Sequence, residues 1–171
     1  MNSNQLPANE YVEYFSTYID ILENVNLQEE LEICLHDFIR FVQNIPLDKF
    51  DYRYDHNKWT IKEIIQHLID AERIFQYRSL RISRNDKTPL TSFNENDYVN
   101  NSDGNSRSIQ DLLTEMAVVR QSTLSLFKSF SNDQLLLTGI ASNNEISVRA
   151  IGFIIIGHQI HHQNFFKERY L

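Results

Sequence analysis

The chain has little cysteine, glycine or proline: one cysteine, four glycines and three prolines in 171 residues. A single cysteine, Cys34, excludes an internal disulfide and is typical of a reducing compartment. A sheet protein with many tight turns would need more glycine and proline, so long helices with few connections are expected. The length allows a sizeable core, and we expect one domain over residues 1–171.

The chain also lacks a basic run, a glycine-rich phosphate loop and a long apolar segment. Its formal charge of −7 argues against a nucleic-acid partner, because a phosphate backbone attracts Lys and Arg. No apolar stretch reaches the roughly 18 residues that a membrane span requires, and the N-terminus has no apolar signal core. These absences predict a cytoplasmic protein that binds neither nucleic acid nor membrane.

Four long helices are expected, each starting at a polar cap: Asn26, Thr60, Ser108 and Ser147. The second is the longest and runs to about Arg84. Residues 9–23 are rich in Tyr, Phe and Ile and predict a short extra helix across the body of the domain. Residues 85–105 form a long connection between the second and third bundle helices, and such a connection usually carries function or covers something. Residues 131–146 form another connection, with a short turn at Asp133–Leu136.

Three of the six histidines lie in one apolar run, from Ile154 to Phe165. On a helix, His158 and His162 fall in the middle of the inward face, one turn apart, and His161 falls on its edge. Two imidazoles with this spacing can reach one metal ion. A third ligand would then have to come from another part of the chain.

His67 on the second long helix also points inward, and it is the natural third ligand. Glu63 and Asp70 flank it. A capping role is favoured for Glu63, because it follows Thr60 by three residues; for Asp70, an ion-pair or supporting role and plain solvation are equally favoured. Arg78 is inward too and is expected to pair with a buried acid rather than with an anionic substrate, and Arg120 is expected near the inward edge of the third helix.

Three inward histidines in a bundle core would leave a metal ion with an open position, the pattern of a catalytic site. That position can hold water or a thiol and lower its pKa. Imidazole ligands suit several divalent metals, of which we expect zinc or nickel ahead of iron or manganese. The rival interpretation is three buried histidines held by ordinary hydrogen bonds. His36 and His56 are expected at the surface.

The last helix is apolar on its back as well, where Phe153 and Ile156 fall opposite the histidines. A helix that is apolar all round is fully buried. In a four-helix domain this predicts a second subunit against that face, and hence a homodimer.

Several segments together resemble the DinB-like (YfiT-like) superfamily, the damage-inducible bundle family: Lys58–Phe75, Arg81–Leu90, Ser147–Ala150, Gly157–His162 and Lys167–Leu171. The resemblance covers nearly the whole chain. It implies a four-helix bundle, often dimeric, with a metal triad of one histidine on the second bundle helix and two, four apart, on the last. In this sequence these are His67, His158 and His162, and the role of His161 stays open. Described relatives include bacillithiol S-transferases, a mycothiol-dependent isomerase and metal-dependent hydrolases.

We therefore expect an all-α four-helix bundle and a metal-dependent enzyme acting on a small molecule. The metal would activate a low-molecular-weight thiol, for an S-transferase reaction, or water. A metal-dependent hydrolase is the second interpretation, and a non-catalytic, metal- or ligand-binding dimeric bundle is the third. The sequence assigns no substrate and no general acid or base.

Overall fold

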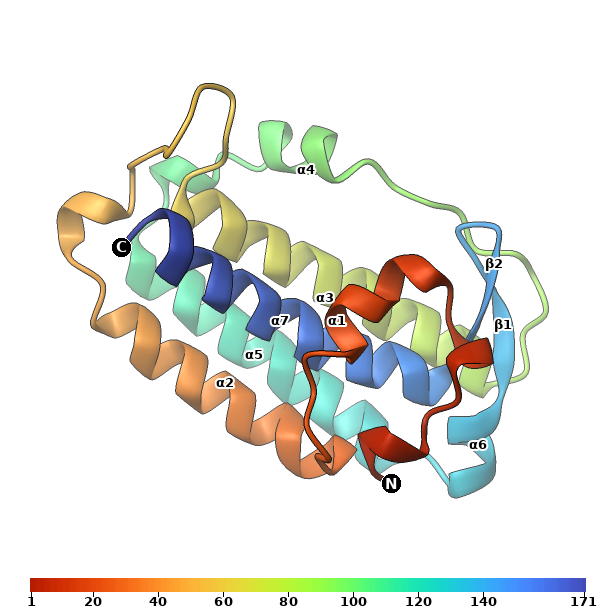
Figure 1. Cartoon of the computed structure of the whole chain (residues 1–171). Coiled ribbons are helices and arrows are strands. Elements are labelled where there is room, and N and C mark those ends of the chain that lie inside the picture. The colour runs from red at the N-terminus through yellow and green to blue at the C-terminus, as the bar shows by residue number, and fades with distance from the viewer.

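A computed structural model describes all residues, 1–171, and confirms the four-helix bundle. Its long helices are α2 (Leu27–Gln43), α3 (Ile61–Ser83), α5 (Ile109–Lys128) and α7 (Val148–Arg169). They run side by side, as Figure 1 shows, and each packs against two others: α3 lies between α5 and α7, and α2 contacts α5 and α7 on the other side. None of the helices combines the length and the apolar composition needed to cross a membrane.

The expected caps start these helices. The side chains of Asn26, Thr60, Ser108 and Ser147 each accept a hydrogen bond from a backbone amide in the first turn. At α3 the capping box is complete, because the Glu63 carboxylate also accepts from the backbone amide of Thr60 at 2.7 Å. Amides that would otherwise lack partners are thereby satisfied, which fixes where each helix begins.

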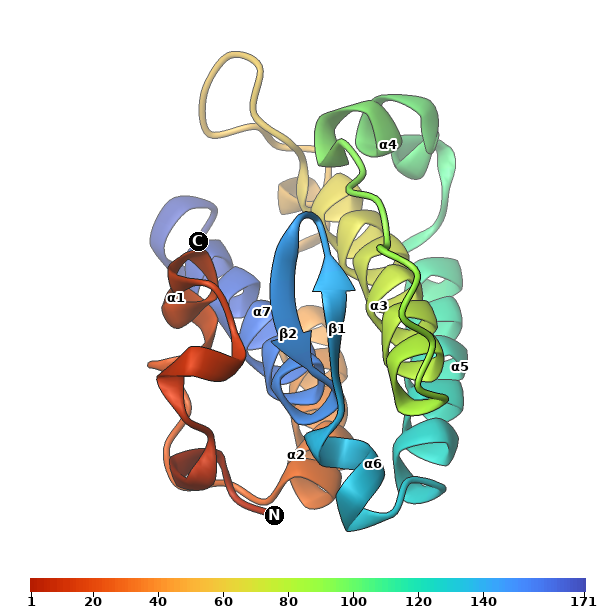
Figure 2. The same ribbon diagram turned by 90° about the vertical axis from the view of Figure 1, so that its right-hand side faces the viewer.

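Short elements surround the bundle. They are the 3₁₀ turns η1 (Ser3–Gln5), η2 (Ala8–Glu10), η3 (Glu13–Phe15), η4 (Leu47–Lys49) and η5 (Gly104–Ser106), the helices α1 (Ser16–Ile19), α4 (Glu95–Asn101) and α6 (Asn132–Leu136), and the strands β1 (Thr138–Ala141) and β2 (Asn144–Ser147). The strands form an antiparallel hairpin with Thr138 opposite Ser147. Figure 2 shows this hairpin between the N-terminal residues and the chain that leaves α3.

Two of these regions differ from expectation. The single helix predicted over residues 9–23 is instead two 3₁₀ turns followed by the four-residue α1. Only Ile19 is buried there, so the segment has no repeated inward stripe to sustain a longer helix. The connection at 131–146 contains the expected short turn as α6, but it also forms the hairpin. Ser142 and Asn143 make its tight turn, both with positive φ.

The back of α7 is covered by the chain itself. Phe153 and Ile156 are both 0% exposed. They pack in a core with residues of α1 and α2, and residues 8–22, which we call the N-terminal segment, cross α7 on this side (Figure 1). The argument for a second subunit against this face was therefore wrong, because α2 and the N-terminal segment already bury it.

A buried polar network ties the bundle together next to the histidines. Arg120, expected near an inward edge, is 1% exposed, and its guanidinium donates to both carboxylate oxygens of Glu72 at 2.7 and 2.9 Å. Thr123 donates to the same carboxylate, and the side-chain oxygen of Gln159 accepts from Arg120 at 2.9 Å. Because Glu72, Arg120 and Gln159 belong to α3, α5 and α7, the network fixes these three helices relative to one another.

Candidate metal centre

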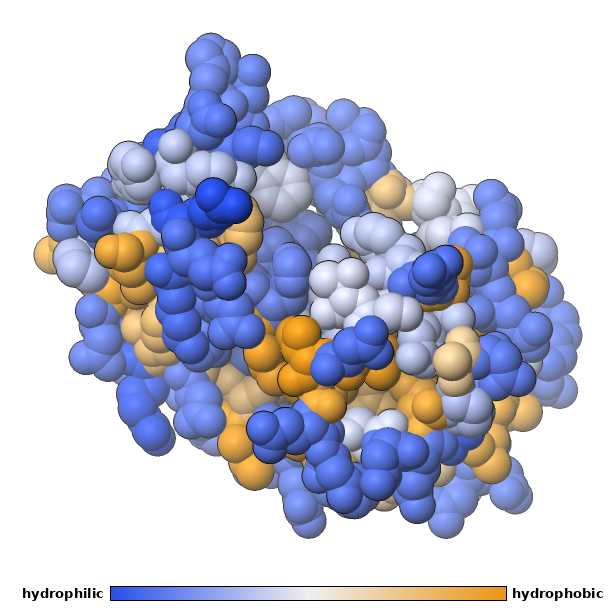
Figure 3. All heavy atoms as spheres, in the orientation of Figure 1, coloured by the Kyte–Doolittle hydropathy of each residue, from blue (hydrophilic) through white to orange (hydrophobic).

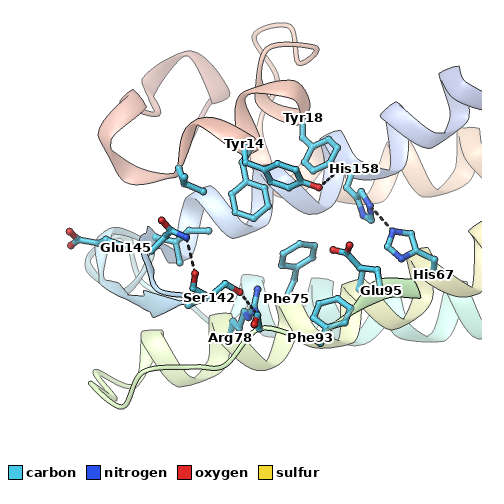
Figure 4. Close-up of a pocket in the computed structure, with 17 residues that line it drawn as sticks. Tyr14, Tyr18, His67, Phe75, Arg78, Phe93, Glu95, Ser142, Glu145 and His158 are labelled. Atoms are coloured by element: carbon cyan, nitrogen blue, oxygen red, sulfur yellow. Dashed lines mark hydrogen bonds between the residues drawn. The ribbon is translucent and has the colours of Figure 1, made fainter. Parts of the chain in front are cut away.

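The structure brings together the three histidines that the sequence singled out. Nε2 of His158 lies 3.0 Å from Nε2 of His67 and 3.1 Å from Nε2 of His162. One ligand atom from each ring can be chosen so that all three lie within 4.8 Å of one another. His67 comes from α3, and His158 and His162 come from adjacent turns of α7. Figure 4 shows the rings of His67 and His158 facing each other. His67 and His158 are each 6% exposed.

Ordinary hydrogen bonds do not satisfy this cluster. A neutral imidazole has one donor and one acceptor nitrogen. If Nε2 of His158 carries the proton, it can point at only one of its two neighbours; if it does not, its single lone pair faces both. Nδ1 of His162 is also buried without a partner. Nitrogens about 2.1 Å from one ion can lie at most about 4.2 Å apart, and the two measured separations are short enough for a shared metal ion.

The electrostatics of the cluster favour the neutral rings that metal binding requires. Burial lowers the pKa of His67 from 6.5 to about 4. Burial, and then the neighbouring histidines, hold the pKa of His158 and of His162 well below the usual value. The three imidazoles are therefore uncharged at neutral pH and keep lone pairs free for a metal ion.

Aromatic rings hold the histidines in place. The ring centroid of Trp59 lies 5.0 Å from that of His67, and the ring centroid of Tyr18 lies 5.1 Å from that of His158. His161 does not join the cluster: its ring packs edge-on against Tyr18, with centroids 5.3 Å apart. The Tyr18 ring thus packs against both His158 of the cluster and His161.

A cavity of about 280 Å³ opens from the cluster. His67 and His158 form part of its wall, and the hairpin forms another part. Its remaining sides come mainly from aromatic residues of the N-terminal segment, of α3 and of the connection between α3 and α5: Tyr14, Phe15, Tyr18, Phe75 and Phe93. Figure 4 shows the Glu95 carboxylate pointing into this cavity near the histidine pair, and Arg78 and Ser142 further away. The space has the size and lining of a small-molecule site.

On the face drawn in Figure 3, polar side chains dominate the rim formed by α4 and the loop before α3. Apolar side chains gather lower on this face, over the N-terminal segment and α2. The surface of the molecule is hollowed between these two regions, and thus between α4 and the N-terminal segment.

The flanking residues have separate roles. Glu63 is the capping residue expected, and it also pairs with Arg53 at 2.8 Å. Asp70 accepts from the side chain of Gln66 at 3.0 Å and lies 3.9 Å from Arg73, so it belongs to a rim ion pair and does not contact the histidines. His36 and His56 are exposed, as predicted.

The prediction for Arg78 was wrong. It pairs with no acid; one of its nitrogens, Nη2, donates to the backbone oxygen of Thr91 at 3.0 Å and to Oγ of Ser142 at 2.8 Å. The buried acid on the same helix, Glu72, pairs with Arg120 instead. A helical wheel cannot separate these two arginines, because both point inward on their helices.

Sequence reasoning missed Glu95 and Tyr18. Glu95 lies in the long connection, immediately after Asn94, whose side chain caps α4 by accepting from two backbone amides. That Asn–Glu pair was the available signal for a helix start in the connection. Tyr18 carried no such signal, because its importance depends on the N-terminal segment folding back over α7.

The family follows from comparison with known proteins. The sequence model of the DinB superfamily matches residues 30–166. The chain belongs to the DinB superfamily. No curated protein matches it. Among solved structures, YfiT from Bacillus subtilis, described as "a probable metal-dependent hydrolase with an unusual four-helix bundle topology", matches with a TM-score of 0.74 and 15% identity, over 86% of this chain and 89% of that chain. At that identity the likeness establishes a shared fold.

Proposed function

We propose that this DinB-superfamily protein is a metal-dependent enzyme in which His67, His158 and His162 hold a divalent metal ion, zinc or nickel ahead of iron or manganese. The observation that carries the proposal is the convergence of the Nε2 atoms of three neutral rings, two of which, His67 and His158, line a cavity. When bound, the ion would make a coordinated thiol or water acidic enough to supply a nucleophile at neutral pH.

A thiol is the favoured nucleophile, and S-transfer to a small electrophile the favoured reaction. The support is the cavity lining: Phe15, Phe75 and Phe93 suit an organic nucleophile and its partner better than water alone. Glu95 is suited to accept the nucleophile's proton, because its carboxylate faces the histidine pair (Figure 4). Tyr18 and Trp59 would keep the ligand rings oriented and bulk water away from them.

Metal-dependent hydrolysis is the second candidate. Two observations favour it: the description of YfiT, which shares the fold, and Glu95, which could equally take a proton from water. A non-catalytic metal or ligand binder is the third. The open cavity beside the cluster supports an enzyme over a non-catalytic binder, since a purely structural metal site would be closed. A homodimer and a cytoplasmic location also remain parts of the proposal.

Metal analysis tests the assignment directly. Protein purified without chelator is expected to carry a transition metal, and His162→Ala is expected to lose most of it. Equal metal content in both proteins would contradict the proposed site. His36→Ala is the matched control, because His36 is an exposed histidine on α2 and should leave the metal content unchanged.

Two assays then separate the candidate reactions. Conjugation of bacillithiol or cysteine to monochlorobimane, lost in His162→Ala, would support thiol transfer. Hydrolysis of 4-nitrophenyl acetate that needs the metal but no thiol would support the hydrolase. A metal-loaded protein that shows neither activity with these probes would favour the binder.

A further inference from the structure

Arg78 occupies the cavity on the side away from the histidines. Its side chain is 6% exposed, and it lines the same cavity as His67. Both residues project from α3, about three turns or roughly 16 Å apart along the helix. Figure 4 shows the cavity extending between them. A ligand that touches the histidine cluster with one end can therefore reach the guanidinium with the other.

Arg78 is the one buried arginine without a carboxylate partner. The other two, Arg120 and Arg149, form ion pairs with Glu72 and Glu10. Nη2 of Arg78 makes both of its hydrogen bonds, to neutral oxygens, while Nε and Nη1 make none. A buried guanidinium without a counter-charge is costly, so the fold leaves a strong anion-binding group unsatisfied here.

The two hydrogen bonds hold the guanidinium against the hairpin. Ser142 lies in the hairpin turn, where its backbone amide donates to the carbonyl of Leu90 at 2.9 Å. Thr91 is the next residue of that same connection. Since Oγ of Ser142 accepts from Arg78, its own hydroxyl proton is free to donate to a ligand. The hairpin turn and the connection thus orient a fork of donors before any ligand arrives.

We propose that this cavity takes a small molecule with an apolar, preferably aromatic, body and a carboxylate that Arg78 and Ser142 bind, with its reacting group at the histidine cluster. The statement about the reacting group rests on the proposed function; the carboxylate subsite does not. A planar guanidinium matches a carboxylate through two parallel hydrogen bonds, which gives both affinity and orientation. The aromatic walls between the two ends, Phe75 and Phe93, supply the apolar contact.

Two acidic residues also line the cavity and could compete with a ligand carboxylate for Arg78. Glu95 and Glu145 both line it, yet neither pairs with the Arg78 guanidinium, whose partners are Thr91 and Ser142. Burial lowers the pKa of Arg78, and the more distant charge of Glu95 raises it. Glu95 lies nearer the histidines (Figure 4), so it weakens carboxylate binding at Arg78 without replacing it.

Calorimetry with a matched pair of ligands tests the subsite: 4-phenylbutyrate and the neutral 4-phenyl-1-butanol. The protein as purified is expected to bind the acid roughly 10- to 100-fold more tightly than the alcohol. Arg78→Met should remove this preference, and Arg73→Met should keep it, because Arg73 lies on the same helix but on the rim. Equal affinities in the wild type, no binding of either ligand at millimolar concentration, or a preference that survives in Arg78→Met would overturn the proposal.

Further variants separate this test from its alternatives. If the ligand's carboxylate binds the metal instead, the preference for the acid over the alcohol will vanish in His162→Ala. If Arg78 binds the carboxylate, His162→Ala will keep that preference, whether or not the protein holds a metal. Arg78→Met could loosen the hairpin, so Ser142→Ala and Glu95→Gln provide tests that keep the guanidinium. Ser142→Ala should weaken acid binding severalfold and Glu95→Gln should strengthen it, with alcohol binding unchanged in both; no change in acid binding in either variant would count against the subsite.

Discussion

The backbone of Tyr18 lies directly against Gly157. A Cβ atom at Gly157 would be 2.0 Å from the carbonyl oxygen of Tyr18 and 2.7 Å from its carbonyl carbon. This approach, possible only without a side chain, lets the N-terminal segment sit close enough to α7 for the Tyr18 ring to contact His158. One glycine therefore controls both the cover of α7 and a wall of the cavity.

Gly157→Ala is expected to push the N-terminal segment away from α7. In an open helix this change would stabilise by about 1 kcal/mol, but here the new methyl group meets backbone that cannot rotate aside. We expect a lower melting temperature and faster hydrogen exchange in residues 11–22. Gly152→Ala is the comparison: its Cβ would meet side chains of Phe127 and Leu27, so it should destabilise without freeing the N-terminal segment. Unchanged exchange in Gly157→Ala would contradict the proposed contact.

Arg120→Met should be among the most destabilising single substitutions in the chain. It would leave Glu72 buried and unpaired, at a cost of about 3–5 kcal/mol in the free energy of unfolding. Replacing both residues, as Glu72→Met with Arg120→Met, should cost clearly less than the two single changes combined, because no uncompensated charge stays inside. Urea unfolding of the four proteins measures this coupling. If the losses in unfolding free energy of the two single variants simply add, Glu72 and Arg120 do not act as a coupled pair between α3 and α5.

Acid should release the N-terminal segment before the bundle unfolds. Burial raises the pKa of Glu10, but hydrogen bonds from Arg149 and Ser147 and the charge of Arg149 hold it, on balance, below its usual 4.5. The Glu10–Arg149 pair therefore stabilises the folded segment fully at pH values above the usual pKa of 4.5. This stabilisation is lost as the pH falls through the lowered pKa of Glu10. Hydrogen exchange of residues 8–22, measured across this range, should rise with acid. Glu10→Gln should show the faster exchange already at neutral pH.

His161 and His162 should differ sharply although they are neighbours. His162 points its Nε2 at His158, whereas His161 packs on Tyr18. We expect His162→Ala to lose metal and His161→Ala to keep it, by elemental analysis of protein purified in parallel. His161→Ala should instead loosen the contact with Tyr18 and lower the melting temperature modestly. Metal loss in both variants would show that the His-His pair acts as one ligand set.

The bundle could be predicted because its signals are local. Asn26, Thr60, Ser108 and Ser147 each satisfy amides within their own helix, so the chain itself carries the helix starts. The convergence of the histidines was predicted less directly. Periodicity showed that His67, His158 and His162 face inward, and the resemblance to the family joined them.

The segments outside the bundle could not be predicted in the same way, because long-range contacts decide them. The hairpin pairs with Leu90 of the connection, a contact that no local pattern shows. The apolar back of α7 was evident, but its cover could equally have been another subunit or the chain's own N-terminal segment. Arg78 and Arg120 looked alike on the helical wheel, and only the position of Glu72 decides which of them is neutralised.

The two ends of the cavity are built by different parts of the chain. Its histidine end comes from α3 and α7, whereas most of its outer wall comes from the N-terminal segment, the connection before α5 and the hairpin turn. The N-terminal segment is tied to α7 and to His158 through Tyr18, whereas the connection and the hairpin turn can change in sequence or length with less effect on helix packing. A single scaffold can in this way evolve toward new substrates while its reactive chemistry stays constant.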